Sequence, residues 1–202
     1  MRAFLGIGLP AGVPEAIAPA IAQVRGLHAP VAWTAPMNLH ITLNFLGEIF
    51  PERVALVERS MRAVASGIGP FSLTAEGGGA FPGTRNPRVL WAGILEPLEL
   101  VRQLQQNMGN ALSGAGFPRE DRPFHPHITV GRTRGALPPA WGERFVQSLS
   151  GKGFGVVPVS SFTLYESRLG PGGAAYTPLC DFRLEGSGKR ELRREIREEK
   201  EP

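Results

Sequence analysis

The sequence predicts a mixed fold in which short strands and helices alternate along the chain and form two similar lobes. Three observations support this prediction. The 202 residues are 42% hydrophobic, which is enough to bury a sizeable core. The 26 glycines and 19 prolines favour many short elements joined by tight turns over a few long helices. The tripeptide His-Ile-Thr occurs twice, at His40 and at His127, each time inside an apolar run typical of a buried strand.

Strands and helices alternate in the first part of the chain. The expected elements are a strand over residues 3–9, a helix that is entered through Pro14 and fades near Gly26, a strand from His40 to Leu46, and an amphipathic helix from Pro51 with Val54, Val57, Met61 and Val64 on one face. Gly47 ends the strand of the first His-Ile-Thr motif.

The same alternation continues in the second part. The expected elements are extended runs from Phe71 and Arg88 separated by a glycine-rich loop over residues 77–87, a helix from about Glu99 to Ser113 with Leu100, Leu104 and Leu112 in its apolar stripe, the second His-Ile-Thr strand, a helix near residues 139–149, and strands from Ser161 and Ala175. We expect residues 1–185 to form a single bilobal domain and residues 186–202 to be a charged, disordered tail without a role in chemistry.

The composition limits the class of protein. The formal net charge is +4, and before the tail the positive charge is almost all arginine, whose planar guanidinium suits phosphate groups. The single cysteine, Cys180, excludes an intrachain disulfide and suits a reducing cytoplasm. No run of 18 apolar residues occurs, so no membrane span is expected.

The repeated motif places chemistry on one face of each strand. In an extended strand, residues two apart point to the same side, so His40 lies beside Thr42, and His127 lies beside Thr129. If two lobes face each other, both polar faces line one cleft. Two imidazoles can act as an acid and base pair near neutral pH, and the hydroxyls can donate to oxygens that gain charge. This set suits in-line displacement at phosphorus without a metal.

Two other readings of the histidines are open. A histidine in a strand is more often packed than reactive, although two copies in matching apolar contexts favour a function. His125 and His127 could also join His40 in a zinc site, but Pro126 and the lack of a similar pair around His40 weigh against this. His28 is read as a solvated loop residue, and no metal or other cofactor is expected.

Four stretches carry a resemblance to a known family. They are NLHITLNFLGE from Asn38, PRVLWAGI from Pro87, FHPHITVGR from Phe124 and LYESRLG from Leu164. Together they resemble the 2H phosphoesterase superfamily and, within it, the bacterial and archaeal RNA 2′,3′-cyclic phosphodiesterases, historically called 2′-5′ RNA ligases. The resemblance spans nearly all of residues 1–185.

The resemblance implies a fold and a reaction. The fold would be α+β and bilobal, with antiparallel sheets from two pseudo-symmetric lobes flanked by helices around a central cleft. His40 would be the general acid that protonates the leaving O3′, and His127 the base that activates water. Thr42 and Thr129 would hold the phosphate oxygens. The substrates would be RNA ends or nucleotides with a 2′,3′-cyclic phosphate, cleaved to 2′-phosphomonoesters by a cytoplasmic monomer.

Further residues near the motifs are candidates for contact with the substrate. Arg132, five positions after His127, stands where many members of that family place a basic residue, and it would bind the phosphate if Gly131 lets the strand bend, because strand parity alone points it to the other face. Asn44 stands where members of the family often carry a basic residue. Phe124 or Tyr165 could stack a base, although core packing explains both.

Two other functions are carried as alternatives. One is an RNA-binding or nucleotide-binding module without turnover, which the two intact motifs argue against. The other is reversible joining of RNA ends through a 2′-5′ bond. The glycine-rich stretch GGGAFPG from Gly77 lacks the lysine of a nucleotide triphosphate cradle, so ATP-driven joining has no visible site.

Overall fold

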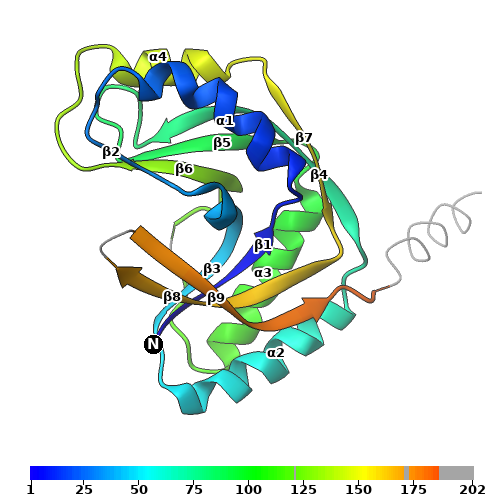
Figure 1. The fold of residues 1–202 in the computed structure, drawn as a ribbon. Coiled ribbons are helices and arrows are strands. Elements are labelled where there is room, and N and C mark those ends of the chain that lie inside the picture. The colour runs from blue at the N-terminus through cyan, green and yellow to red at the C-terminus, as the bar shows by residue number, and fades with distance from the viewer. Residues whose placement is uncertain (121, 171–172, 187–202) are drawn as a thin grey trace, which may run out of the picture.

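The computed structural model describes residues 1–120, 122–170 and 173–186 (Figure 1). The strands are β1 (Arg2–Gly8), β2 (Val31–Trp33), β3 (His40–Glu48), β4 (Phe71–Phe81), β5 (Val89–Leu95), β6 (His127–Thr133), β7 (Gly153–Val159), β8 (Ser161–Gly170) and β9 (Gly173–Arg183). The helices are α1 (Gly12–Arg25), α2 (Val54–Ser66), α3 (Glu99–Gly114) and α4 (Trp141–Leu149), with short 3-10 helices η1 (Pro36–Asn38) and η2 (Pro51–Arg53). Residues 187–202 of the expected tail lie outside the described residues.

The strands form one antiparallel sheet in the order β7-β4-β5-β6-β3-β1-β8-β9, and β2 pairs with β6. Among the described residues, β3 and β6 pair only at Ile41 and Ile128. The sheet therefore divides into two halves that diverge from a narrow junction. Figure 1 shows it curving around an open concave side, with β2, β4, β5, β6 and β7 in one half and β1, β3, β8 and β9 in the other.

Two helices cover the outer face of each half. Helices α1 and α4 contact each other and pack on β7 and β4, whereas α2 and α3 contact each other and pack on β9 and β3 (Figure 1). Each half buries its own aromatic pair. Trp141 and Phe145 of α4 stack on each other, with ring centroids 6.0 Å apart, and Phe162 and Phe182 stack in the other half, 5.0 Å apart. The expected α+β fold with two similar lobes is confirmed.

The sequence located the helices but misplaced one apolar stripe. Val57, Met61 and Val64 of α2 are buried as predicted. In α3 the prediction that Leu100 belongs to the apolar face is wrong, because its side chain is 45% exposed. The buried stripe consists of Val101, Leu104, Met108 and Leu112, which repeat at helical spacing one residue away from the predicted start.

The glycine-rich stretch is another correction. Residues 77–81 were expected in a loop, but they continue β4 as far as Phe81. Neighbouring side chains explain the glycines. A Cβ at Gly78 would overlap Leu149 of α4, and a Cβ at Gly79 would overlap the ring of Trp91. The stretch therefore admits two large side chains against a strand, and no phosphate cradle is needed to account for it.

Two strands were not predicted. β2 is three residues long, and β7 contains Pro158 and two glycines, Gly153 and Gly155, so neither shows a strong strand pattern. Both are set by their partners, β6 and β4. Over the described ranges, no helix is long and apolar enough to cross a membrane.

Candidate active site

The two His-Ile-Thr motifs meet at the junction between the halves. Ile41 and Ile128 pair there and are fully buried. In antiparallel pairing the residue before one partner lies opposite the residue after the other. His40 therefore lies next to the threonine of the second motif, and His127 next to the threonine of the first. All four polar side chains point away from the isoleucines and are half-buried. The structure thus brings both motifs to one surface.

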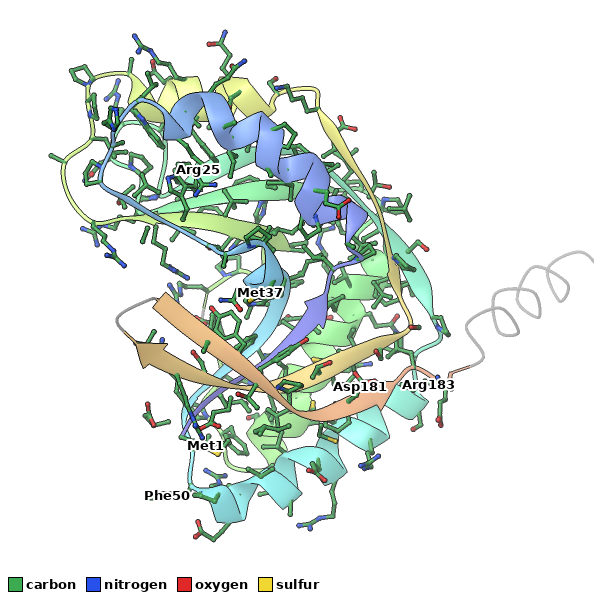
Figure 2. The ribbon with its side chains drawn as sticks, in the orientation of Figure 1. Met1, Arg25, Met37, Phe50, Asp181 and Arg183 are labelled. Atoms are coloured by element: carbon green, nitrogen blue, oxygen red, sulfur yellow. The ribbon has the colours of Figure 1, made fainter. Side chains whose placement is uncertain are left out.

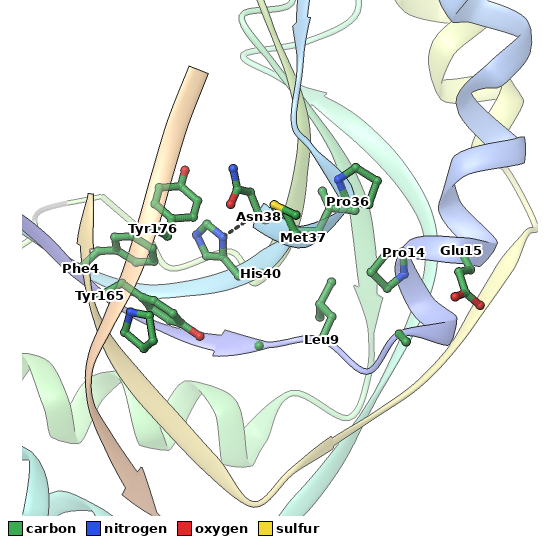
Figure 3. Close-up of a pocket in the computed structure, with 14 residues that line it drawn as sticks. Phe4, Leu9, Pro14, Glu15, Pro36, Met37, Asn38, His40, Tyr165 and Tyr176 are labelled. Carbon is green, nitrogen blue, oxygen red and sulfur yellow. Dashed lines mark hydrogen bonds between the residues drawn. The ribbon is translucent and has the colours of Figure 1, made fainter. Parts of the chain in front are cut away.

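Both imidazoles are held by the backbone two residues earlier. His40 Nδ1–H donates to the carbonyl of Asn38 at 2.7 Å, as the dashed line in Figure 3 marks, and His127 Nδ1–H donates to the carbonyl of His125 at 2.6 Å. A carbonyl can only accept, so Nδ1 carries a hydrogen in both rings. In each ring Nε2 is therefore the nitrogen that can exchange a proton with a ligand.

The threonines differ in their contacts. Thr42 Oγ1 lies 2.9 Å from His40 Nε2 and donates to it when the ring is neutral. Thr129 has no side-chain hydrogen bond among the described residues, so its hydroxyl is available to a ligand. The contact of Thr42 places a hydroxyl beside the proton-exchanging nitrogen of His40.

A β-bulge brings Arg132 to the same face. In the pairing of β6 with β5, Val130 is the extra residue between Thr129 and Gly131. An extra residue reverses the alternation of side chains beyond it. Arg132 therefore faces the histidines, and its positive charge contributes to the lowered pKa of His127. The sequence analysis made contact of Arg132 with the phosphate conditional on a bend at Gly131, and the bulge lies at the residue before this glycine.

Gly131 is required where the bulged strand pairs with β2. A Cβ at this position would lie 2.9 Å from Val31 Cγ1 and 3.2 Å from Trp33 Cε3, both closer than ordinary packing allows. The side chains of Val31 and Trp33 thus occupy the face of the sheet opposite to Arg132.

A matching bulge in β3 gives a different result. Leu43 is the extra residue against β1, so Asn44 turns toward the helices and Phe45 turns toward the cleft. Asn44 is 8% exposed, and its Nδ2 lies 4.0 Å from the position of a Cβ on Gly109 of α3. Phe45 is 54% exposed, and its ring lies 6.2 Å from that of Phe4. The position that corresponds to Arg132 in the first motif is therefore aromatic.

Burial and positive charge lower the pKa of both histidines. For His40, burial lowers the pKa most, the hydrogen bond to Asn38 opposes it, and the charges of His127 and Arg132 lower it further. For His127, burial again dominates, the bond to His125 opposes it, and the charges of His125 and Arg132 add to the lowering. Mutual repulsion means that the pair resists holding two protons at once.

Aromatic side chains surround each histidine, and the sequence analysis did not anticipate most of them. The ring of His40 lies 4.7 Å from Phe4 and 5.2 Å from Tyr176, edge to face with the latter. The ring of His127 lies 5.3 Å from Phe81 and 6.1 Å from Trp91. Their contribution to the site is set by strand pairing between distant segments, for which the sequence carries no local signal.

A pocket of about 550 Å³ opens beside His40 (Figure 3). It runs from Tyr176 and Tyr165, along Leu9 and Met37, toward the start of α1. Tyr165, which the sequence offered as a base-stacking residue, lines this pocket. Phe124, offered alongside it, is half-buried against the hydrophobic core.

Asn38 ties the pocket wall to the β8–β9 hairpin. Its Nδ2 donates to the carbonyl of Ala174 in β9 at 2.6 Å, and its own carbonyl accepts from His40. The hairpin that carries Tyr176 is thereby joined to the segment that orients the imidazole. Figure 2 shows β8 and β9 in the lower half of the sheet, of which they are the last two strands, with Met37 above them at the open side.

A zinc site was an alternative reading of the three histidines. His125 is exposed, and its ring centroid lies 6.4 Å from that of His127. Within the part of the chain that the structure describes, no group of three His, Cys, Asp or Glu side chains is placed to hold a metal ion.

Comparison with known proteins agrees with this geometry. A family model described as LigT like Phosphoesterase matches residues 7–91 and 95–176. The chain belongs to the LigT-like phosphoesterase family. The resemblance seen in the four sequence stretches is thereby confirmed.

Relatives and solved structures match this LigT-like phosphoesterase over most of their length. An RNA 2′,3′-cyclic phosphodiesterase of Archaeoglobus fulgidus is 36% identical over 90% of this chain and 99% of its own. The crystal structure of TT0787 of Thermus thermophilus matches with a TM-score of 0.75 and 32% identity, covering 93% of this chain and all of that one. Escherichia coli LigT complexed with 3′-AMP matches with a TM-score of 0.67 and 31% identity, covering 91% and 97%.

Proposed function

We propose that the protein hydrolyses 2′,3′-cyclic phosphates at RNA ends or on nucleotides and leaves 2′-phosphomonoesters. Relatives that share about a third of its sequence over almost their whole length are named RNA 2′,3′-cyclic phosphodiesterases. The observation that carries the proposal is the junction geometry, in which two imidazoles, two threonine hydroxyls and Arg132 share one face of the sheet.

Each group has a role in the proposed reaction. Neutral His127 takes a proton from water through Nε2 as the water oxygen attacks phosphorus. The bond between phosphorus and O3′ breaks, and protonated His40 gives its Nε2 proton to O3′. The products are a 2′-phosphate and a free 3′-hydroxyl. Arg132 and the hydroxyls of Thr42 and Thr129 bind the non-bridging oxygens and stabilise their charge in the transition state.

The position of the leaving oxygen determines where the nucleoside lies. O3′ departs toward His40, so the ribose and base occupy the half of the cleft that contains this residue. The 550 Å³ pocket begins beside His40 and extends toward the start of α1, and its size is in the range of pockets that bind small molecules. The half-buried rings of Tyr165 and Tyr176 offer aromatic surfaces near the ring of His40, which suits a nucleoside on this side.

The pair of histidines also sets the expected pH dependence. One ring has to be neutral and the other protonated, so kcat/KM should follow a bell-shaped curve. Because burial lowers the pKa of both His40 and His127, the curve should be centred below the ordinary histidine value of 6.5.

The deciding experiment is product analysis on an oligonucleotide that ends in a 2′,3′-cyclic phosphate. We expect only the 2′-monoester, with the same rate in EDTA. His40→Ala and His127→Ala should each lower kcat by about 10²-fold to 10⁴-fold, since each removes a proton transfer. His28→Asn serves as a control, because His28 is exposed in a loop with a φ of 45°, which asparagine tolerates.

Three results would contradict the proposal. They are a 3′-monoester as the product, loss of turnover in chelator, or a His127→Ala variant that keeps most of its activity. Binding of the cyclic phosphate without turnover would instead indicate a nucleotide-binding module.

We further infer that the protein acts as a monomer in the cytoplasm. Both motifs, Arg132 and the pocket come from one chain, so the proposed site needs no second copy. The single cysteine suits a reducing compartment. Sedimentation at working concentration tests the oligomeric state, and a stable dimer would contradict it.

A further inference from the structure

We propose that Glu15 makes the pocket beside His40 selective for guanine as the base of the cyclic phosphate nucleotide. This inference rests on the proposed function, because that reaction places the base in this pocket. Glu15 lines the pocket from the first turn of α1. Figure 3 shows it at the opposite end of the pocket from His40 and Tyr176, with Leu9 and Pro14 between them.

Glu15 differs in charge from the other residues that line the pocket. Its walls are mostly apolar or aromatic, and the polar groups near the catalytic end are the amide of Asn38 and the tyrosine hydroxyls. Among the lining residues, Glu15 alone carries a formal negative charge. A carboxylate repels an anionic substrate, so its presence in this pocket calls for a compensating donor on the ligand.

Glu15 is also free to accept hydrogen bonds. Among the described residues it forms no ion pair, and its side chain has no hydrogen-bond partner. Its side chain is exposed and belongs to the first turn of α1. The carboxylate therefore remains available to accept hydrogen bonds from a ligand.

Guanine is the base whose far edge matches an ionised carboxylate. Its N1–H and N2–H groups are parallel donors, and a carboxylate accepts two such bonds at once. Adenine presents an acceptor at N1 beside its N6 donors, so one of the two contacts is repulsive. Cytosine offers a donor at N4, but as a single ring it extends less far from the ribose toward Glu15.

The orientation of the nucleotide fits this assignment. With its phosphate beside His40 and Arg132, the nucleotide extends along the pocket, and the edge of a purine that lies farthest from the ribose faces the start of α1. Phe4, Tyr165 and Tyr176 lie at the catalytic end, whereas Pro14 and Met37 line the route to Glu15. Met37 is 90% exposed, so the pocket is open along one side and admits a base that is still joined to an RNA chain.

The test compares kcat/KM for the 2′,3′-cyclic phosphates of guanosine, inosine, adenosine and cytidine. The native enzyme should prefer guanosine over adenosine by about fivefold to tenfold, the lower part of the range for a bidentate contact because the site is exposed. Inosine, which lacks the N2 amino group, should fall between them. Glu15→Gln should abolish or reverse the preference, since a carboxamide pairs with N1 and N6 of adenine.

Glu99→Gln is the matched control. Glu99 also lies in the first turn of a helix and is exposed, but it belongs to α3 and does not line the pocket. Both variants should lose a similar small amount of thermal stability, and the control should keep the native preference. A role of Glu15 in helix stability alone would change the melting temperature and leave the ratio of guanosine to adenosine unchanged.

The outcomes separate this inference from the proposed function. Equal turnover of guanosine and adenosine by the native enzyme, or an unchanged ratio in Glu15→Gln, overturns the inference while the hydrolase remains. If no cyclic nucleotide is hydrolysed, the proposed function fails, and calorimetry with guanosine and adenosine 2′-phosphates still tests the pocket. Tighter binding of the guanosine ligand, lost in Glu15→Gln, supports the inference in that case, and equal binding overturns it.

Discussion

At the scale of single residues, the two imidazoles have the same local geometry and different surroundings. Each donates Nδ1–H to the carbonyl two positions earlier, so Nε2 is the reactive nitrogen in both. His40 lies among Phe4 and two tyrosines, on the side where the pocket opens, whereas His127 lies nearer to Trp91. A division into acid and base therefore depends on which ring faces the leaving group, because their hydrogen bonds to the backbone do not distinguish them.

Arg132 should affect both rate and pH dependence. Arg132→Gln removes a charged donor to the phosphate, and we expect kcat/KM to fall by about 10²-fold to 10³-fold. Burial is the main cause of the lowered pKa of His40 and His127, and the charge of Arg132 lowers it further. Removing that charge raises the pKa of both rings, so the pH profile should move to higher pH.

Steady-state rates across the pH range check this prediction. Arg134→Gln is the control, since Arg134 is exposed just after the same strand and should leave the profile in place. A large loss of rate without any move of the profile would mean that Arg132 does not act on the histidines through its charge.

At the scale of secondary-structure elements, two bulges determine which side chains face the cleft. In β6 the bulge at Val130 turns Arg132 inward, and in β3 the bulge at Leu43 turns Phe45 inward. In both motifs the extra residue of the bulge therefore stands three positions after the histidine. One half of the cleft gains a guanidinium for phosphate, and the other gains an aromatic ring.

The bulge in β6 can be tested through Gly131. A Cβ in Gly131→Ala would press on Val31 and Trp33, so we expect the free energy of unfolding to fall by about 1–3 kcal/mol. The strand must shift to relieve the contact, which displaces the guanidinium of Arg132 and should raise KM. Denaturant titration and steady-state kinetics measure the two effects.

Gly135 offers a comparison for this substitution. A Cβ there would lie 3.5 Å from Pro30 Cγ, an ordinary contact, so Gly135→Ala should keep both stability and KM near native values. Native kinetics in Gly131→Ala would show that the bulge tolerates a side chain and that Arg132 is positioned by other contacts.

At the scale of the whole molecule, the halves of the sheet are joined over a short length at the site itself. Ile41 and Ile128 pair between β3 and β6, and both side chains are fully buried. The backbone residues that flank this pair carry both histidines. The Ile41–Ile128 pair therefore contributes both to packing between the halves and to the alignment of the two histidines.

Truncating one of these isoleucines should damage both properties. Ile41→Ala removes buried methyl groups, and we expect it to lower the free energy of unfolding by about 2–5 kcal/mol. Because the cavity lies between the histidine strands, kcat should also fall by about tenfold or more, through loss of the alignment that catalysis needs.

The matched comparison is Ile17→Ala, at a site in α1 that is 1% exposed and is not part of the β3–β6 pairing. It should cost similar stability with a nearly native kcat. If the two variants lost kcat to the same degree under conditions where both are folded, the junction would have no special role in alignment.

The amino-acid sequence was enough to predict the helices, most of the strands, the two histidine motifs and the face that each motif presents. These follow from local periodicity, since residues two apart on a strand share a side wherever the strand is placed. The buried face of α2 followed from helical spacing in the same way, and the error at Leu100 of α3 was a displacement of one residue within a correct helix. The resemblance of the motif stretches was enough to identify the family.

The further residues that join the motifs could be identified only from the folded chain. The face of Arg132 and the burial of Asn44 depend on bulges, and a bulge exists only relative to a partner strand. The short strand β2, the aromatic neighbours of each imidazole and the place of Glu15 in the pocket likewise require segments distant in sequence to meet. The local sequence pattern does not predict such pairings, because they depend on packing across the whole sheet.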